Sequence, residues 1–218
     1  MALLVNGQNI YDDIKKINET YGNSNKLYST VDYLIFISET DTDYMLKSGW
    51  KYIRYNEKFF KYSDENVIMQ NDSIKIYIDK KAKTIIVSKA KTIPLIDFNL
   101  DQIQASLSLE KTYTYIDFKD NNVGYKFIFN GNEREYESLT LKFNKTTFLI
   151  SEICIIAVKN KENWSINNPQ KLVIKYNYSA NEDINLQIFD EKNYINIKED
   201  NISVNEIYRE YKIINRIR

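Results

Sequence analysis

The stretch Lys58–Lys89, KFFKYSDENVIMQNDSIKIYIDKKAKTIIVSK, decides the fold class of this chain. Short apolar runs in it are separated every few residues by side chains that favour turns. Closely spaced strands of this kind predict an antiparallel meander. We expect strands at Lys58–Tyr62, Asn66–Gln70, Ile74–Ile78 and Thr84–Ser88, with turns at Ser63-Asp64, Asn71-Asp72 and Asp79–Lys83.

On the N-terminal side, a helix is expected before the strands begin. Asn9 can cap it, and apolar residues then recur at spacings of three and four, which gives one buried stripe. From Leu27 to Ser38 the period changes to two, as in a strand with one face covered. Two short strands, split by a turn at Ser48-Gly49, are expected next. The helical stripe consists of Ile10, Ile14, Ile17 and Tyr21, and the two strands are Tyr44–Leu46 and Lys51–Tyr55.

On the C-terminal side, Lys91–Leu109 interrupts the strands. Pro94 prevents pairing, and a short helix is expected to present Leu100, Ile103 and Leu107 on one side. Strands then resume at Thr112–Phe118, Tyr125–Phe129, Ser138–Phe143, Phe148–Val158 and Lys171–Tyr178, and less regular ones at Ile184–Phe189, Tyr194–Ile197 and Tyr208–Ile214.

Composition excludes several classes of site. The 218 residues hold 30 basic and 30 acidic side chains, so no net field attracts nucleic acid. Histidine is absent and Cys154 is the sole cysteine, which removes His-dependent nucleophile pairs, His-containing zinc sites and intrachain disulfides. We expect no enzyme and no cofactor or metal. Basic residues gather only near the C-terminus, where a solvated tail is expected, at Arg209, Lys212, Arg216 and Arg218.

The middle of the chain resembles the LolA-like periplasmic carriers of outer-membrane lipoproteins. The resemblance rests on a charged strand with an aromatic pair (Lys58–Tyr62), a turn, the segment Asn71–Asp79, a tight hairpin and Thr84–Val87. Leu139–Phe143, Phe148–Val158 and Leu172–Tyr176 fit the family's second half. Ser73 replaces the glycine usual after the turn Asp, and no Arg stands at Phe59, where the family's lid latch would fall, so Arg54 is the nearest candidate.

The resemblance implies a mainly β fold: an incomplete, half-open antiparallel β-barrel with an N-terminal helix and a short mid-chain helical lid. It implies one LolA-like domain over residues 1–218, with a core at 9–178 and an extension at 179–218 that completes or flanks the sheet. The implied function is lipid binding and transport: a monomeric periplasmic carrier or chaperone of the bacterial envelope that holds acyl chains of lipoproteins or lipids in an apolar concave groove. Membrane-anchored donor and acceptor proteins are the implied partners.

Apolar residues at strand spacing, together with the lid residues, are the expected ligand-binding set. An acyl chain of about fifteen methylenes gains about 12 kcal/mol on burial, and no reactive group is required. The set comprises Val31, Tyr33, Ile35, Ile37, Ile74, Ile76, Ile78, Leu100, Ile103, Leu107, Tyr125, Phe127, Phe129, Leu139, Leu141 and Phe143.

Other interpretations stay open at this point. The same half-barrel suits a non-enzymatic scaffold or accessory subunit of an envelope complex that binds a protein segment. Exposed tyrosines and tryptophans would suit a surface glycan-binding protein. Met1–Gln8 is either the end of a secretory signal whose charged start is missing, consistent with a periplasmic location, or a short first strand.

Overall fold

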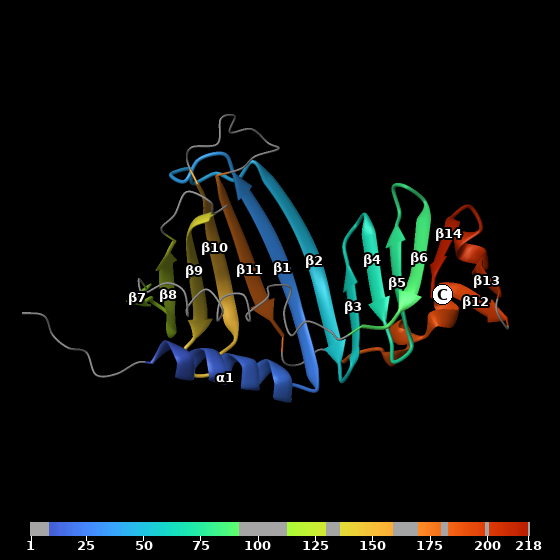
Figure 1. The fold of residues 1–218 in the computed structure, drawn as a ribbon, viewed down its shortest axis with the longest axis horizontal. Helices are drawn as coiled ribbons and strands as arrows, with labels where there is room; N and C mark the ends of the chain where they lie inside the picture. Colours follow the sequence, from blue (N-terminus) through green and yellow to red (C-terminus); the bar gives the residue numbers. More distant parts are fainter. Residues whose placement is uncertain are drawn as a thin grey trace, which may run out of the picture. The chain divides into compact units, whose positions relative to one another are not determined.

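The computed structural model describes residues 9–91, 113–129, 136–158, 170–179, 183–198 and 201–217. Figure 1 shows a mainly β chain with one α-helix near its start. The helical elements are α1 (Ile10–Asn23) and the 3₁₀ turns η1 (Leu186–Phe189), η2 (Glu191–Asn193) and η3 (Glu206–Tyr208). The strands are β1 (Lys26–Phe36), β2 (Leu46–Tyr55), β3 (Lys58–Tyr62), β4 (Asn66–Gln70), β5 (Ile74–Asp79), β6 (Thr84–Lys89), β7 (Tyr113–Asp117), β8 (Asn122–Ile128), β9 (Tyr136–Asn144), β10 (Ile150–Ala157), β11 (Lys171–Tyr178), β12 (Ile195–Lys198), β13 (Asn201–Val204) and β14 (Lys212–Arg216).

The main sheet has twelve strands in the linear order β14-β6-β5-β4-β3-β2-β1-β11-β10-β9-β8-β7, so its two ends do not pair and it is not closed into a barrel. Pairs from β2 to β6 and from β7 to β11 are antiparallel, whereas β14 runs parallel to β6. The predicted class, a mainly β incomplete barrel with an N-terminal helix, is confirmed. Within the described ranges, no helix has the length and apolar character needed to cross a membrane.

The chain divides into two compact units, each built from separated segments. Unit 1 comprises residues 1–23, 31–48 and 94–177, and unit 2 comprises residues 24–30, 49–93 and 178–218. The predicted single domain with a core at 9–178 stays a prediction. Each unit is described below by itself.

In unit 1, the helix forms where the sequence predicts it. The Asn9 side chain caps the first turn by accepting a hydrogen bond from the backbone N–H of Tyr11 at 3.1 Å. The whole predicted stripe is buried, with exposed fractions of 0 to 2% for Ile10, Ile14, Ile17 and Tyr21. Figure 1 shows α1 lying across the ends of β8, β9 and β10.

One glycine is required inside strand β8 of unit 1. A Cβ atom at Gly124 would lie 2.1 Å from the backbone oxygen of Leu141 in β9. The strand expected from the sequence begins only at Tyr125, whereas in the structure β8 begins at Asn122 and continues through Gly124, where only hydrogen fits against the neighbouring backbone.

Two expectations about individual strands are wrong. Strand β2 runs without a break from Leu46 to Tyr55, so Ser48-Gly49 is not a turn. Residues predicted as a strand from Ile184 instead form the 3₁₀ turn η1, because the Asn185 side chain accepts a hydrogen bond from the Gln187 N–H and starts a helical turn.

Candidate functional site

Helix α1 is held on the unit 1 sheet by hydrogen bonds between buried groups. Tyr125 Oη donates to Asp13 Oδ2 at 2.7 Å, and the Ile150 backbone N–H donates to Tyr21 Oη at 3.0 Å. Asp13 is 3% exposed, and both tyrosines are fully buried. Burial, followed by the hydrogen bond to Asp13, raises the pKa of Tyr125 above its ordinary value. The helix is therefore a well-anchored cover for the part of the sheet beneath it.

Strand register in unit 1 collects apolar side chains on the face that α1 covers. Tyr125 lies opposite Leu141, which lies opposite Ile153, which lies opposite Ile174. The next row repeats the pattern with Phe127, Leu139, Ile155 and Leu172, and β7 adds two tyrosines. We call this surface the first apolar face; it comprises Tyr113, Tyr115, Val123, Tyr125, Phe127, Leu139, Leu141, Phe143, Ile153, Ile155, Leu172 and Ile174.

Strand β1 contributes to the same face through its odd-numbered residues. Leu34 and Phe36 pack with Val173 and Cys154, in a small cluster. Val173 and Cys154 alternate with Ile174 and Ile153, so this cluster lies on the opposite side of the sheet. By the same alternation, Tyr33 and Ile35 point to the side of the first apolar face, whereas Ile37 follows the end of β1.

Burial falls along the first apolar face with distance from the residues that contact α1. Tyr125 and Ile153 are fully buried, whereas Ile155 is 9% exposed and Tyr113 is 41% exposed. Tyr33, Ile35 and Leu172 are half-buried. The apolar surface therefore extends beyond what the helix covers.

Reactive chemistry has little support in the described residues. Within them, no group of three or more His, Cys, Asp or Glu side chains is placed to hold a metal ion. Burial raises the pKa of the half-buried Cys154 thiol, which disfavours the nucleophilic thiolate.

In unit 2, the C-terminal residues cover one face of strands β4 to β6. Ile76, Ile78 and Ile85 are each 0% exposed, and they form one core with Tyr194 and Ile195. Ile74 belongs to the same core. The predicted binding residues Ile74, Ile76 and Ile78 thus lie under the chain's own C-terminal segment.

The opposite face of unit 2 carries a second row of apolar residues. Ile68 lies opposite Tyr77, Tyr77 opposite Ile86, and Ile86 beside Ile214 of the parallel strand β14. All four side chains are half-buried, unlike their sequence neighbours in the core. We call this row, Ile68, Tyr77, Ile86 and Ile214, the second apolar face. Sequence alternation alone does not reveal it, because each strand contributes a single apolar residue to this side, with a polar residue two positions before and after it.

The start of the mid-chain segment is attached to unit 2. The side chain of Gln70, 3% exposed, donates from Nε2 to the Lys91 carbonyl at 2.6 Å and accepts from the Lys91 N–H at 3.3 Å. The predicted lid residues that follow, Leu100, Ile103 and Leu107, lie outside the described residues.

Arg54 lies directly opposite Phe59, the position at which the family resemblance places its latch arginine. Its side chain is 7% exposed, and Nε donates to the Asn56 carbonyl at 3.2 Å. A latch role for Arg54 stays a prediction.

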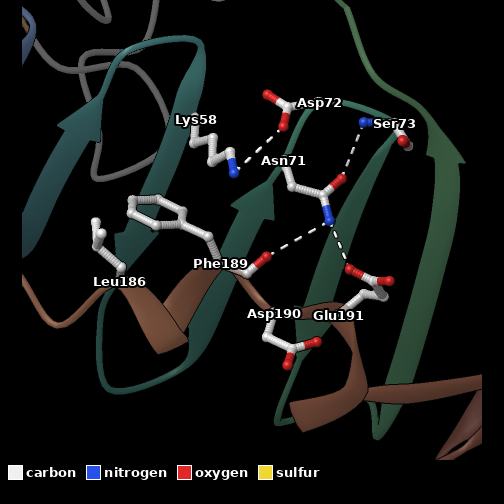
Figure 2. Close-up of a pocket in the computed structure, with 8 residues that line it drawn as sticks. All are labelled: Lys58, Asn71, Asp72, Ser73, Leu186, Phe189, Asp190 and Glu191. Atoms are coloured by element: carbon white, nitrogen blue, oxygen red, sulfur yellow. Dashed lines mark hydrogen bonds and ion pairs between the residues drawn. The ribbon is translucent and has the colours of Figure 1, made fainter.

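Unit 2 also has a surface pocket of about 340 Å³ where η1 and η2 meet the turn between β4 and β5. Figure 2 shows Asn71 at its centre, donating to Glu191 Oε2 at 2.7 Å and to the Phe189 carbonyl at 3.4 Å. Lys58 and Asp72 form an ion pair of 3.2 Å at its edge. These contacts join the turn to the C-terminal segment, so the polar walls have a structural role. The lining residues are Lys58, Asn71, Asp72, Ser73, Leu186, Phe189, Asp190 and Glu191.

The structure brings together five of the predicted binding residues as cross-strand neighbours. Tyr125, Phe127, Leu139, Leu141 and Phe143 all lie on the first apolar face, and Phe129, half-buried, continues the β8 alternation. Val31 in β1 is 2% exposed. Ligand contact by any of the predicted residues stays a prediction. Sequence reasoning missed Leu172, Ile174 and Ile153, which the alternation of their own strands could have indicated.

No family model matches this chain, and no curated protein matches its sequence. Among solved structures, the chain is similar to an uncharacterized conserved protein from Thermus thermophilus, with 7% identity and a TM-score of 0.49, over 94% of this chain and 98% of that one. It is also similar to the LolA superfamily protein NE2245 from Nitrosomonas europaea, with 12% identity and a TM-score of 0.32, over 82% and 96%.

A further match is a putative outer-membrane lipoprotein-sorting protein domain from Vibrio parahaemolyticus, with 9% identity and a TM-score of 0.35, over 84% of this chain and 98% of that one. The names of two of these structural matches agree with the LolA-like resemblance predicted from the sequence. Because each of these TM-scores is below 0.5, the likenesses carry no weight for function, which has to come from the chain's own residues.

Proposed function

We propose that the protein binds the acyl chains of lipoproteins or lipids on the first apolar face of unit 1 and carries them as a non-enzymatic periplasmic protein. The observation that carries this proposal is the fall in burial along that face. Side chains beneath α1 are fully buried, but Ile35 and Leu172 are half-buried and Tyr113 is 41% exposed.

An acyl chain is the occupant whose chemistry matches this surface. The face offers aliphatic and aromatic side chains, and an acyl chain gains about 0.8 kcal/mol for each methylene that it buries. Binding of this kind requires shape and an apolar lining, without any reactive group. The family resemblance in the sequence supports the same function, and with it the envelope location and the donor and acceptor partners.

A competition experiment tests the proposal. An environment-sensitive acyl-chain probe is titrated into the protein and displaced with a triacylated peptide or with the same peptide deacylated. We expect saturable binding that only the acylated peptide reverses. Leu172→Asp and Ile35→Asp should each weaken binding more than tenfold, which is about 1.4 kcal/mol or more, because a carboxylate would enter the apolar face.

Ile128→Asp is the matched control. Ile128 is an apolar residue of the same unit, 39% exposed, that alternates with Phe127 and so points away from the first apolar face. It should leave binding unchanged. Equal losses in all three variants, or no saturable binding by the wild type, would contradict acyl-chain carriage and favour a scaffold that binds a protein segment.

A further inference from the structure

Two of the basic residues near the C-terminus, Lys212 and Arg216, are part of the sheet. Strand β14 pairs in parallel with β6, so that Lys212 lies beside Thr84, Ile214 beside Ile86 and Arg216 beside Ser88. Because side chains alternate along a strand, Lys212, Ile214 and Arg216 point to one side. The solvated tail expected from the sequence is therefore wrong for these residues.

Ile214 extends the second apolar face to the edge strand of the sheet. The face crosses four neighbouring strands, β4, β5, β6 and β14, which are spaced about 4.8 Å apart, so that it spans about 14 Å. Its members are half-buried, while Ile78 and Ile85 on the reverse side of the same strands are 0% exposed. This length of apolar surface suits an alkyl chain lying across the strands.

Positive charge lies beside this apolar row. Lys212 and Arg216 flank Ile214 and are exposed, and Lys75 lies on the same side of β5, beside Tyr77. The Lys75 ammonium also lies 5.8 Å from the centre of the Phe59 ring. At the other end of the row Lys61 lies opposite Ile68, with its ammonium 4.5 Å from the centre of the Trp50 ring. At β14, in contrast, two exposed cations stand on either side of Ile214 along the strand, so positive charge is densest there.

Among the described residues of these four strands, negative charge on this side is confined to Asp79. Its carboxylate accepts a hydrogen bond from the Ala82 N–H at 2.7 Å and so serves the β5–β6 turn. Glu210, close to β14 in sequence, is paired with Lys83. With Lys75, Lys212 and Arg216 against Asp79, the surface favours an anion over a cation.

We propose that the second apolar face binds a single-chain anionic amphiphile, with its alkyl chain along Ile68, Tyr77, Ile86 and Ile214 and its anionic head at Lys212 and Arg216. Lysine and arginine both donate charge-assisted hydrogen bonds to carboxylate and phosphate oxygens. The site shares no residue with the acyl-chain site proposed for unit 1, so it stands or falls separately.

The test compares monomeric dodecyl phosphate, dodecyl maltoside and dodecyltrimethylammonium by isothermal titration calorimetry below their micellar concentrations. We expect dodecyl phosphate to bind at least tenfold more tightly than either of the others, and its affinity to fall as salt is raised. Lys212→Ser/Arg216→Ser should weaken dodecyl phosphate binding at least tenfold. Ile214→Thr should weaken it severalfold, because it shortens the apolar row at its charged end.

Lys198→Ser/Arg209→Ser is the matched control. It removes the same charge from exposed positions of the same unit that lie outside the second apolar face, and it should not change binding. Equal affinity for the anionic and neutral amphiphiles would overturn the proposal, as would equal loss in the two double variants. Binding only to anionic vesicles and not to the monomer would also overturn it, as would loss of dodecyl phosphate binding in the unit 1 variant Ile35→Asp.

Discussion

The two units use different structural elements to cover their strands of the main sheet. Unit 1 uses a single helix, in which Asp13 and Tyr21 accept buried hydrogen bonds from Tyr125 and from the Ile150 N–H. Unit 2 uses a C-terminal segment of 3₁₀ turns and short strands, which packs Tyr194 and Ile195 into the core and adds β14 to the sheet. In both units the cover closes part of the apolar surface and leaves another part half-buried. Both covers pack apolar side chains against the sheet, and they differ in their hydrogen bonds. In unit 1 these bonds join buried groups of the helix to the sheet, whereas in unit 2 they join the part-buried Asn71 to Glu191 and pair strand β14 with β6.

The largest expected loss of stability comes from a substitution that disrupts strand pairing in unit 1 and leaves unit 2 untouched. Gly124→Ala places a methyl group 2.1 Å from the Leu141 backbone oxygen, and we expect a loss of about 3 to 4 kcal/mol in the stability of unit 1. Urea unfolding followed by hydrogen exchange would show whether unit 2 keeps its protection. Gly22→Ala is the control, since a Cβ there meets nothing within 4 Å, and it should change stability by about 1 kcal/mol or less. Similar losses in both variants would contradict the steric argument.

Next in size is the apolar contact that holds the cover of unit 2. Ile195 is 0% exposed, so Ile195→Ala should cost about 2 to 4 kcal/mol and should lower protection in β4 to β6 first. Ile197→Ala, at a neighbouring position of β12 that is 46% exposed, should cost about 0.5 kcal/mol or less. Hydrogen exchange read strand by strand distinguishes the two. Unchanged protection in Ile195→Ala would show that the C-terminal residues are not what stabilises this core.

A smaller effect is expected for the hydrogen bond that holds the cover of unit 1. Tyr125→Phe leaves the buried Asp13 carboxylate without this donor, at a cost of about 1 to 3 kcal/mol. Because the folded-state pKa of Tyr125 is raised, its contribution is fully present below about pH 10, the unfolded value, and is lost as the pH rises above it. Wild-type stability should therefore fall more steeply above about pH 10 than that of Tyr125→Phe. Parallel pH profiles would contradict this assignment.

The smallest effect concerns the ion pair at the edge of the unit 2 pocket. The side chains of Lys58 and Asp72 are 35% and 67% exposed, so solvent screens their attraction. Lys58→Ala should change stability by about 0.5 kcal/mol or less, with little dependence on salt. A loss above about 1 kcal/mol in thermal unfolding would contradict the assignment of Lys58 and Asp72 to a solvent-screened surface pair.

Local patterns predicted much of this fold because they depend on neighbouring residues. The Asn9 cap, the buried helical stripe and the hairpins of Lys58–Lys89 all follow from spacing and turn chemistry. Local patterns do not predict which segment covers which face of the sheet, because that contact joins segments far apart in sequence. Period two marks the side of β5 that carries Ile76 as the buried one, but it does not indicate that the C-terminal residues are what covers that side.

The candidate site was predictable to a similar degree. Alternation placed Tyr125, Phe127 and Leu141 on one face of unit 1, and the strand register confirms that they are grouped. It could not place Lys212 and Arg216, because a parallel pairing between β6 and β14 has no local signature in the sequence.

The late arrival of the unit 2 cover has a consequence for biosynthesis. Tyr194 comes 105 residues after Lys89, the last residue of β6 (194 − 89 = 105). At about 5 to 20 residues per second, a nascent chain would display the uncovered isoleucines of β4 to β6 for about 5 to 20 seconds before their cover is synthesised. The helix of unit 1, in contrast, is synthesised before the strands that it covers. Unit 2 is thus the part of this protein that most needs protection from aggregation during translation.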